Sequence, residues 1–324
     1  MVEGLVSTII PVRNRGGMLR EAVASVIAQT YRPIEVIIVE DGSTDQTAAV
    51  ADHLAANNSD EIRVIHQHNT GPGPARETGR LAATGEFIQY LDSDDLLLPL
   101  KFELQVDGLR SNPDCGVSYG KTRYRRSDGI AEVEPWKGSG TKVETMFPAF
   151  LLSRWWDTPT PLYRSSLCRQ AGPWTCLRLE EDWEYDCRIA SLGVRLHRSE
   201  EFVAEVRDHG DHRLCKGDAL DPGRLSERAK AHQMIFSHAR SAGIDETVLE
   251  MQHFARELFL LSRQCGAAGV IAESKQLFDL ARVASGEARG KGWDFKVYSF
   301  LAGLVGWTRL GKMACYSDGI RSER

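Results

Sequence analysis

The sequence predicts an α/β fold with a mostly parallel sheet flanked by helices, followed by an α-helical C-terminal region. In the first half of the chain, short β-branched runs alternate with helical patterns, which is typical of a parallel sheet covered on both faces. Beyond about residue 221 the pattern is helical, with few strand signals. The 324 residues, 42% of them hydrophobic, can bury one large core with a smaller unit beside it. We therefore predict one domain over residues 1–218 and a helical region over 219–324.

The predicted elements follow the chain in order. The strands are residues 6–12, 34–39, 63–66 and 86–92, and helices over 18–29, 44–56 and 74–83 lie between them. Ser43 and Gln46 stand at capping-box spacing and predict a side-chain cap on the second helix. We then expect a helix over 101–110, a strand over 116–119 and a polar hairpin or loop over 123–141.

Charge and cysteine content exclude several classes of protein. The net charge of -5 argues against a general nucleic-acid binder, because duplex binding requires many basic side chains. The seven cysteines are scattered without a C-x-x-C pair, so neither a disulfide framework nor a zinc site is indicated. No basic segment and cleavage site precede the first strand, which argues against export. The prediction is a cytoplasmic protein, with peripheral attachment to the inner face of the cell membrane left open.

The longest uncharged apolar run, about residues 297–307, is shorter than the roughly 20 residues of a membrane-spanning helix. Basic residues flank this run and aromatic residues are interleaved with it. Two interpretations stay open. The segment is either an interfacial helix on an anionic membrane or a core helix that closes the C-terminal bundle.

An acidic turn, Glu40-Asp41-Gly42-Ser43, follows the second predicted strand. Doubly wound sheets bind their ligands at the carboxyl ends of strands, so Asp41 is a candidate to accept hydrogen bonds from a nucleoside base or ribose. Gly42 allows the backbone to turn sharply there. The structural alternative is an ordinary Asp-Gly turn before a helix.

A second acidic cluster, Asp92-Ser93-Asp94-Asp95, follows the fourth predicted strand. Carboxylates crowded at this point repel one another unless a cation neutralises them or water surrounds them. Mg²⁺ or Mn²⁺ fits, because such an ion takes one or two protein carboxylates together with substrate phosphate oxygens. The structural alternative is an Asp-rich loop that caps the next helix.

A third acidic run, residues 180–186, opens a predicted helix. Asp182 and Asp186 lie on one helical face, and Asp182 is a candidate general base for the proton of an attacking hydroxyl. Trp183 is a candidate to exclude water or stack on a sugar ring. The alternative is simple N-terminal capping, since acidic residues in a first turn are favoured by the helix dipole.

These blocks, taken in order, resemble glycosyltransferase family 2, whose members have the GT-A fold and transfer sugars with inversion. The resemblance covers roughly residues 5–210. It rests on STIIPVRN at 7–14, ASVIAQTY at 24–31, IEVIIVEDGSTD at 34–45, NTGPGPAR at 69–76, GEFIQYLDSDD at 85–95 and EDW at 181–183. The sequence departs from the family pattern at Glu77, where Asn is usual, and this puts in doubt a hydrogen bond normally made in the donor pocket.

The resemblance implies a role for each matching residue. It implies that Pro11, Arg13 and Asp41 line the nucleoside pocket and that Arg76 lies near the donor. Asp92 and Asp94 match the D-x-D motif, with Asp92 near the ribose or donor sugar and Asp94 on the metal. Asp182 matches the catalytic base, with Glu181 beside it, and His209 or His212 falls where relatives contact the diphosphate or the metal.

The resulting hypothesis is an enzyme that moves a sugar from a nucleoside-diphosphate sugar, expected to be UDP-linked, to a saccharide or lipid-linked saccharide. Family context places it in cell-surface polysaccharide or lipopolysaccharide assembly. Residues 71–76 match a dinucleotide fingerprint poorly, because Pro72 and Pro74 lack N–H donors. A nucleotidyltransferase would need a basic, glycine-rich loop, which residues 13–17 resemble only faintly. A non-catalytic nucleotide-sugar-binding scaffold is the other alternative, and Asp182 discriminates against it.

Overall fold

The computed structural model describes residues 1–209 and 217–322. The chain divides into two compact units. Unit 1 comprises residues 1–146, 154–185 and 192–211, and unit 2 comprises residues 147–153, 186–191 and 212–324. The predicted domains over 1–218 and 219–324 stay a prediction.

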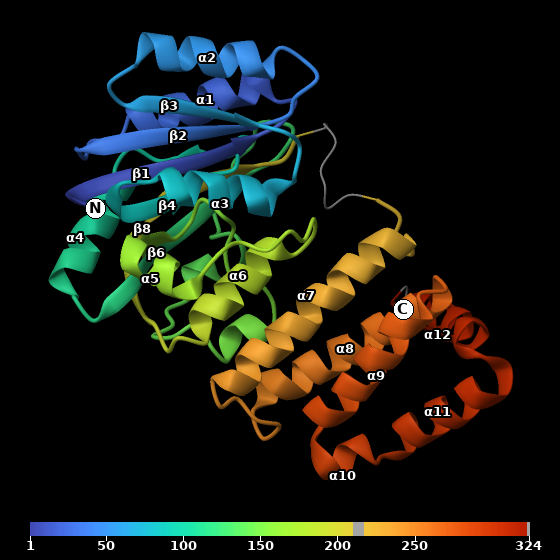
Figure 1. Ribbon diagram of the computed structural model, residues 1–324. Helices are drawn as coiled ribbons and strands as arrows, with labels where there is room; N and C mark the ends of the chain where they lie inside the picture. The colour runs from blue at the N-terminus through green and yellow to red at the C-terminus, as the bar shows by residue number, and fades with distance from the viewer. Residues whose placement is uncertain (210–216, 323–324) are drawn as a thin grey trace. The chain divides into compact units, whose positions relative to one another are not determined.

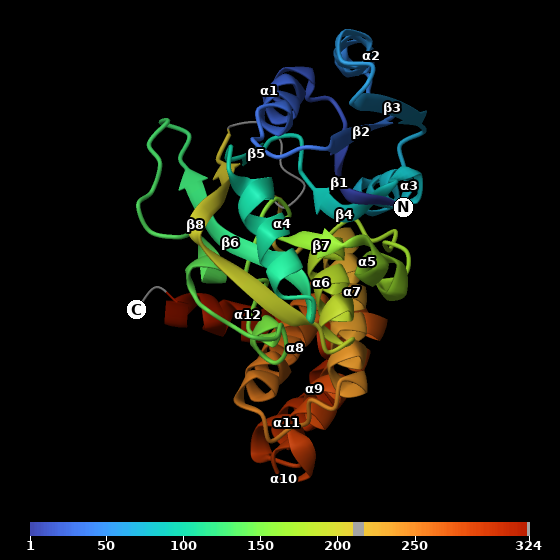
Figure 2. The same ribbon diagram turned by 90° about the vertical axis from the view of Figure 1, so that its left-hand side faces the viewer.

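Unit 1 is built on one eight-stranded sheet in the order β3-β2-β1-β4-β7-β6-β8-β5. The half formed by β3, β2, β1 and β4 is labelled in Figure 1, and β5 and β7 are labelled in Figure 2. The strands are β1 (Val2–Val12), β2 (Ile34–Asp41), β3 (Ile62–Gln67), β4 (Gly85–Tyr90), β5 (Leu96–Leu97), β6 (Cys115–Arg125), β7 (Leu162–Arg164) and β8 (Arg195–Arg207). Strands β3, β2, β1 and β4 pair in parallel, whereas β7 runs antiparallel to both β4 and β6. The sheet is therefore mixed, with a parallel half that carries the carboxyl-end clusters.

Six α-helices of the described chain begin in unit 1: α1 (Gly16–Ile27), α2 (Thr47–Asn57), α3 (Pro72–Ala82), α4 (Lys101–Ser111), α5 (Ser165–Ala171) and α6 (Glu181–Ala190). Alternation along β2 explains how they cover the sheet. Val36 and Ile38 join the core with α1 and α2, while Ile37 and Val39 pack with Ala75 of α3 on the opposite face. Helix α4 packs against β6 and β8, which pair in parallel (Figure 2).

One predicted cap is wrong. Helix α2 begins at Thr47, and its N-cap residue, Gln46, makes no side-chain capping bond. The Ser43 hydroxyl instead accepts a hydrogen bond from the backbone N–H of Asn14 at 3.0 Å. The side chain of Asp45 accepts from Thr47 N at 2.8 Å. Ser43 therefore joins the loops after β1 and β2 rather than closing the helix.

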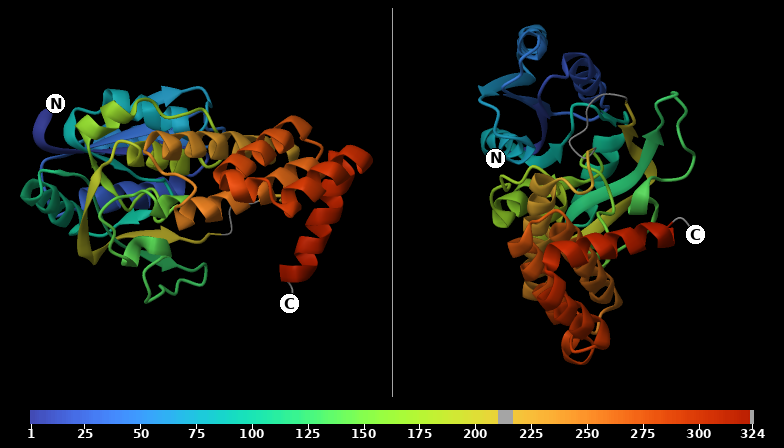
Figure 3. Two further views of the ribbon diagram at one scale, coloured as in Figure 1. Left: turned by 90° about the horizontal axis from the view of Figure 1, so that it is seen from below. Right: turned by 90° about the vertical axis from the view of Figure 1, so that its right-hand side faces the viewer.

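The described part of unit 2 is helical. Its elements are a short 3₁₀ turn (Ala149–Leu151), α7 (Pro222–Ser241), α8 (Leu249–Ala267), α9 (Ile271–Ala284), α10 (Gly286–Gly290), α11 (Trp293–Val305) and α12 (Trp307–Ser322). Helix α8 packs against α7, α9 and α12. Figure 3 shows these orange and red C-terminal helices gathered in one bundle. Its buried residues recur at helical spacing through Met251, Phe254, Leu258 and Leu261. No helix among the residues described is long and apolar enough to cross a membrane.

Candidate active site

Three strands bring the predicted residues to one edge of the sheet. Because β1, β2 and β4 run in parallel, their carboxyl ends meet there. Asp41 ends β2, and residues 92–95 follow β4 directly. Strand β8 ends at Arg207, whose backbone N–H donates to Asp95 Oδ1 at 3.3 Å. This bond brings His209, just beyond β8, to the same edge.

Asp41 organises the loop that enters α3. Its Oδ1 accepts hydrogen bonds from Thr70 N at 2.9 Å and Gln67 Nε2 at 2.8 Å, and its Oδ2 accepts from Gly71 N at 2.9 Å. The next residue, Gly42, has a φ of +66°, and a Cβ there would lie 2.7 Å from Asn69 N. Glycine is therefore required where the two loops cross. The predicted contact of Asp41 with a nucleoside stays a prediction.

Pro11 and Arg13 border the same turn. Pro11 is half-buried near the end of β1 and pairs in register with Val39 of β2. Arg13 is exposed, and its Nε donates to the carbonyl of Gly42 at 3.4 Å. Both residues therefore lie beside the loop that Asp41 holds, where a nucleoside pocket was predicted.

Asp94 lies between an arginine, Arg15, and a histidine, His209. Its Oδ2 accepts a hydrogen bond from Arg15 Nη1 and lies 2.8 Å from His209 Nε2. Burial opposes ionisation of Asp94, but the charge of Arg15 and the bond to His209 outweigh it and lower the pKa of Asp94 below its usual value. The other ring nitrogen of His209, Nδ1, is buried without a hydrogen-bond partner among the described residues. Asp94 and His209 thus form a pair, as their shared assignment to a metal requires.

Asp95 shows how crowded these carboxylates are. Its side chain is buried, and burial raises the pKa of Asp95 well above its usual value. The negative charges of Asp94 and Asp92 raise that pKa further. The repulsion expected from the sequence is therefore present in the fold, and added positive charge would relieve it.

Arg76 connects the cluster after β4 with the start of α6. Arg76 is 3% exposed, and its guanidinium donates from Nη2 to Asp92 Oδ1 and from Nη1 to Glu181 Oε1, both at 2.7 Å. Its Cζ lies 4.9 Å from the centroid of the Trp174 ring, a cation–π contact. One arginine therefore holds together two acidic groups that are 89 residues apart in the sequence.

Glu181 is a buried carboxyl group with an unusual titration. Burial raises the pKa of Glu181 to about 7, and the neighbouring carboxylate of Asp182 adds to this effect. The Arg76 guanidinium acts in the opposite direction, without cancelling the increase. The preceding residue, Glu180, has a φ of +61°, a left-handed conformation that is uncommon outside glycine.

Asp182 has the opposite titration. Burial would raise its pKa, but the positive charges of Arg154, Arg76 and Lys137 lower the pKa of Asp182 below its usual value. Its Oδ2 accepts a hydrogen bond from Arg154 Nη1 at 2.5 Å, and its Oδ1 accepts from Trp183 N at 2.7 Å. The pKa values of two adjacent carboxyl groups are thus shifted in opposite directions, an arrangement that recurs in acid–base catalysis.

The site includes residues that the motifs did not identify. Arg154 pairs with Asp182 but comes from a region with no periodic pattern, so the sequence held no signal for it. Arg15 follows β1 two residues after Arg13, and its position at the carboxyl edge was a usable signal. Lys137 lies in the predicted polar loop and pairs with Asp157 outside it at 2.5 Å, and its charge also acts on Asp182. His212 lies outside the described residues.

The donor set matches a hard divalent cation that completes its coordination with substrate oxygens. No three His, Cys, Asp or Glu side chains converge as a ready-made metal cage within residues 1–209 and 217–322. Asp94, His209 and Asp92 nevertheless provide carboxylate and imidazole donors, and the buried Nδ1 of His209 lacks a partner there. An ion using these residues would need further ligands, which a diphosphate provides.

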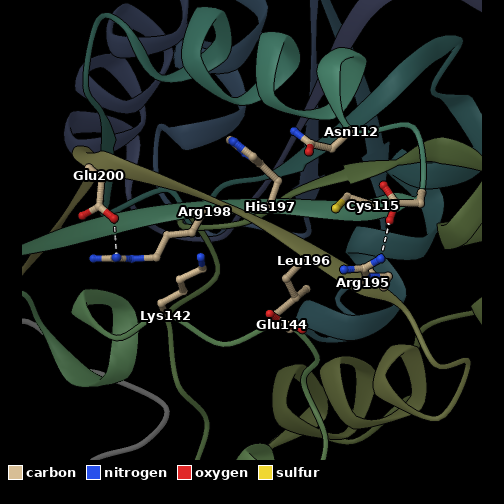
Figure 4. Close-up of a pocket in the computed structure, with 10 residues that line it drawn as sticks. Asn112, Cys115, Lys142, Glu144, Arg195, Leu196, His197, Arg198 and Glu200 are labelled. Atoms are coloured by element: carbon tan, nitrogen blue, oxygen red, sulfur yellow. Dashed lines mark hydrogen bonds and ion pairs between the residues drawn. The ribbon is translucent and has the colours of Figure 1, made fainter.

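A separate pocket of about 260 Å³ lies where β6 and β8 begin, at the opposite end of these strands (Figure 4). Its charges are largely matched internally. Arg195 pairs with Asp114 at 2.7 Å, and Arg198 pairs with Glu200 at 2.5 Å. The predicted site residues all lie elsewhere, so this pocket does not contribute to the candidate site.

The sequence is similar to that of a known protein family and of several of its members. Residues 7–166 match the family model described as Glycosyl transferase family 2. The chain is 40% identical over 114 residues to an uncharacterized glycosyltransferase of Nostoc, a match that covers 35% of each protein. It is 35% identical over 127 residues to the glycosyltransferase GlyG of Streptococcus pneumoniae, covering 39% of this chain and 42% of that protein. The chain thus spans about a third to two fifths of the length of these relatives.

Solved structures share the fold over nearly the whole chain. TarS of Staphylococcus aureus, residues 1–349 in complex with UDP-GlcNAc, superposes with a TM-score of 0.69 at 18% identity, over 97% of this chain and 92% of that one. A mannosyltransferase of Pyrobaculum calidifontis in complex with GDP-Man and Mn²⁺ gives a TM-score of 0.51 at 16% identity, over 95% and 86%. The predicted GT-A fold with C-terminal helices is confirmed.

Proposed function

The chain belongs to glycosyl transferase family 2, and on this premise we propose that it is an inverting, metal-dependent enzyme acting on a nucleoside-diphosphate sugar. The observation that carries the proposal is the double ion pair of Arg76, which holds Asp92 of the donor side next to Glu181 and Asp182 of the acceptor side. Sugar transfer needs these two sets of carboxylates in one site, because donor and acceptor react directly.

We assign the donor as a UDP-linked sugar and the acceptor as a hydroxyl of a saccharide or lipid-linked saccharide. The fold resembles TarS, whose structures contain UDP-GlcNAc or UDP, and this likeness supports a uridine nucleotide. Pro11, Arg13 and Asp41 are the proposed nucleoside contacts. The biological role that we propose is assembly of cell-surface polysaccharide or lipopolysaccharide.

Asp182 is the proposed general base. Arg154 and Arg76 lower its pKa, so it is ionised at neutral pH and able to accept the proton of the acceptor hydroxyl. As that oxygen forms its bond to the anomeric carbon, the bond from this carbon to the nucleoside diphosphate breaks, and the configuration inverts. Glu181 does not touch the reacting atoms in this scheme. It shares Arg76 with Asp92 and thereby positions Asp182.

Asp94, Asp92 and His209 are the proposed ligands of Mg²⁺ or Mn²⁺. When bound, the cation supplies positive charge that stabilises the leaving diphosphate. The mannosyltransferase that contains Mn²⁺ shares the fold and supports this assignment. Arg15 contacts Asp94. If Asp94 binds the cation instead, the guanidinium of Arg15 becomes available to bind the phosphate oxygens of the donor.

The test is thermal stabilisation by nucleotide sugars, followed by turnover. UDP-sugars with Mn²⁺ at 100 times their Kd should stabilise the protein by about 2.7 kcal/mol through mass action, and EDTA should remove the effect. Asp182→Asn should reduce turnover by roughly 100-fold or more while leaving donor affinity within about threefold. Asp94→Ala should abolish the Mn²⁺-dependent stabilisation. The exposed Asp128→Asn serves as the matched control and should change neither.

The alternative is a scaffold that binds nucleotide sugars without catalysis. It predicts Mn²⁺-independent binding and no product with any donor and acceptor pair. Full turnover by Asp182→Asn would reject the proposed base, and stabilisation that survives EDTA would reject the proposed metal.

A further inference from the structure

Helix α11 of unit 2 is apolar on two opposite sides. Its inner side carries Phe295, Tyr298 and Ala302, all buried. The Phe295 ring lies 5.0 Å from that of Phe259 in α8 and 5.5 Å from that of Phe278 in α9. These aromatic contacts hold α11 on the bundle, so its orientation is fixed by packing.

The outer side of α11 is exposed although it is equally apolar. Trp293 is 82% exposed, and Phe300 and Leu304 are each 66% exposed. With Val297 they occupy positions i, i+4, i+7 and i+11, which form one stripe along a helix. At 100° per residue this stripe lies opposite the three buried residues. Leu301 and Val305 are also exposed at its border.

Such a face normally marks an interaction site, because soluble proteins rarely leave large apolar side chains contiguous and uncovered. The helix is too short to span a bilayer, since 13 residues extend only about 20 Å. A helix of this length with aromatic residues on its outer side instead fits the boundary between lipid headgroups and acyl chains.

The charge around this face identifies its partner. Residues 286–317 contain five basic and two acidic residues, a net charge of +3, whereas the whole chain has a net charge of -5. Lys296 is exposed on α11, and Arg309 and Lys312 are exposed on α12. On α12, Arg309, Met313 and Tyr316 follow helical spacing, and the last two are 65% and 76% exposed. Basic and apolar side chains thus alternate over both helices.

We propose that α11 and α12 bind the surface of an anionic lipid bilayer. The apolar stripe from Trp293 to Leu304 enters the headgroup boundary, and Lys296, Arg309 and Lys312 attract the lipid phosphates. The two contributions add, because apolar burial and electrostatic attraction each strengthen interfacial binding. A second copy of this chain has a negative overall charge, but in a symmetric dimer its own α11 and α12 would face these helices and would be equally basic. The basic residues therefore favour an anionic bilayer over a second copy. This inference does not depend on the proposed enzymatic function.

The test is co-sedimentation of the full chain with vesicles. The wild type should bind vesicles of phosphatidylcholine and phosphatidylglycerol in a 3:1 ratio, and pure phosphatidylcholine much more weakly. Phe300→Glu/Leu304→Glu should lower partitioning on the order of 100-fold, because two large side chains leave the boundary. Its melting temperature should stay unchanged, since both residues face away from the bundle. Phe300→Ala/Leu304→Ala should give a smaller loss in the same direction.

Leu249→Glu is the matched control, because Leu249 is 81% exposed in unit 2 but lies on α8 outside the stripe. It should bind like the wild type. Lys296→Glu/Lys312→Glu should remove the preference for phosphatidylglycerol. Equal binding by wild type and Phe300→Glu/Leu304→Glu overturns the proposal, and so does absence of wild-type binding to the anionic vesicles. A third outcome assigns the face to a second copy instead. In that case the wild type is a dimer without lipid, Phe300→Glu/Leu304→Glu is a monomer, and both bind vesicles equally.

Discussion

Replacing Glu181 by glutamine should make the protein more stable in alkaline solution. The glutamine carbonyl can still accept the hydrogen bond that Arg76 donates to Glu181 Oε1 at 2.7 Å. The substitution removes the ability of the buried side chain to ionise, and glutamine itself does not titrate. Any pH dependence that disappears in Glu181→Gln therefore comes from this one carboxyl group.

The magnitude follows from the two pKa values of Glu181. Burial and Asp182 raise the pKa of Glu181 from 4.5 in the unfolded chain to about 7 in the fold. A folded-state pKa above the unfolded value stabilises the protein at low pH, and this stability is lost as the pH rises from about 4.5 through about 7. Linkage then predicts that the wild type loses about 2 kcal/mol between pH 5.5 and pH 8.5 relative to Glu181→Gln.

Denaturant unfolding of both proteins at pH 5.5, 7 and 8.5 measures this difference. Glu132→Gln, at an exposed position in unit 1, is the control and should follow the wild type at every pH. The gap between wild type and Glu181→Gln should widen mostly between pH 5.5 and 7.5 and level off above it. Parallel stability curves for these two proteins would refute the reasoning, because they would mean that Glu181 is already ionised in the fold at pH 5.5.

Three further substitutions test other parts of unit 1. Arg76→Lys keeps the positive charge, but a single ammonium group does not reproduce the two 2.7 Å bonds that the guanidinium donates to Asp92 and Glu181. We therefore expect a loss of roughly 2–4 kcal/mol in the free energy of unfolding, and a melting temperature equal to that of the wild type contradicts this. Burial lowers the pKa of the fully buried Lys101 well below 10.5, which costs stability increasingly as the pH falls below 10.5. The free energy of unfolding of Lys101→Met should therefore rise relative to that of the wild type by on the order of 1 kcal/mol for each pH unit as the pH is lowered from about 10 to about 8. A difference that stays constant over this range rejects the idea. Gly42→Ala places a Cβ 2.7 Å from Asn69 N at a φ of +66° and should lower the free energy of unfolding by about 1–3 kcal/mol, whereas Gly17→Ala, where a Cβ meets nothing within 4 Å, should not.

The parallel half of the fold was predictable because its signals are local. β-branched runs and helical periodicity predicted strands β1 to β4 and helices α1 to α3, and the predicted ends lie within a few residues of the observed ends. The cap at Ser43 failed for a non-local reason. Its hydroxyl bonds to Asn14 across 29 residues, and this competing partner cannot be read from the spacing of a capping box.

The second half of the sheet was harder to predict for physical reasons. Strand β7 has three residues, too few for an alternating pattern. Strand β8 mixes charged and apolar residues, and its pairing with β6 shifts register several times, so no regular alternation marks it in the sequence. The acidic clusters themselves were visible as motifs. Their neighbours Arg154 and Lys137 were not, since each reaches its acidic partner by tertiary packing from irregular segments.

The pairing of β8 with β6 and β5 limits how far the chain can be shortened. The family match ends at residue 166, just after β7, but β6 obtains its long pairing from β8, and β5 pairs with β8 as well. A truncated chain ending at residue 166 would leave β6 as an open sheet edge and would lack α6 and His209 altogether. The shortest fragment that could complete this sheet must extend through residue 207, so chains that end before that position should be insoluble.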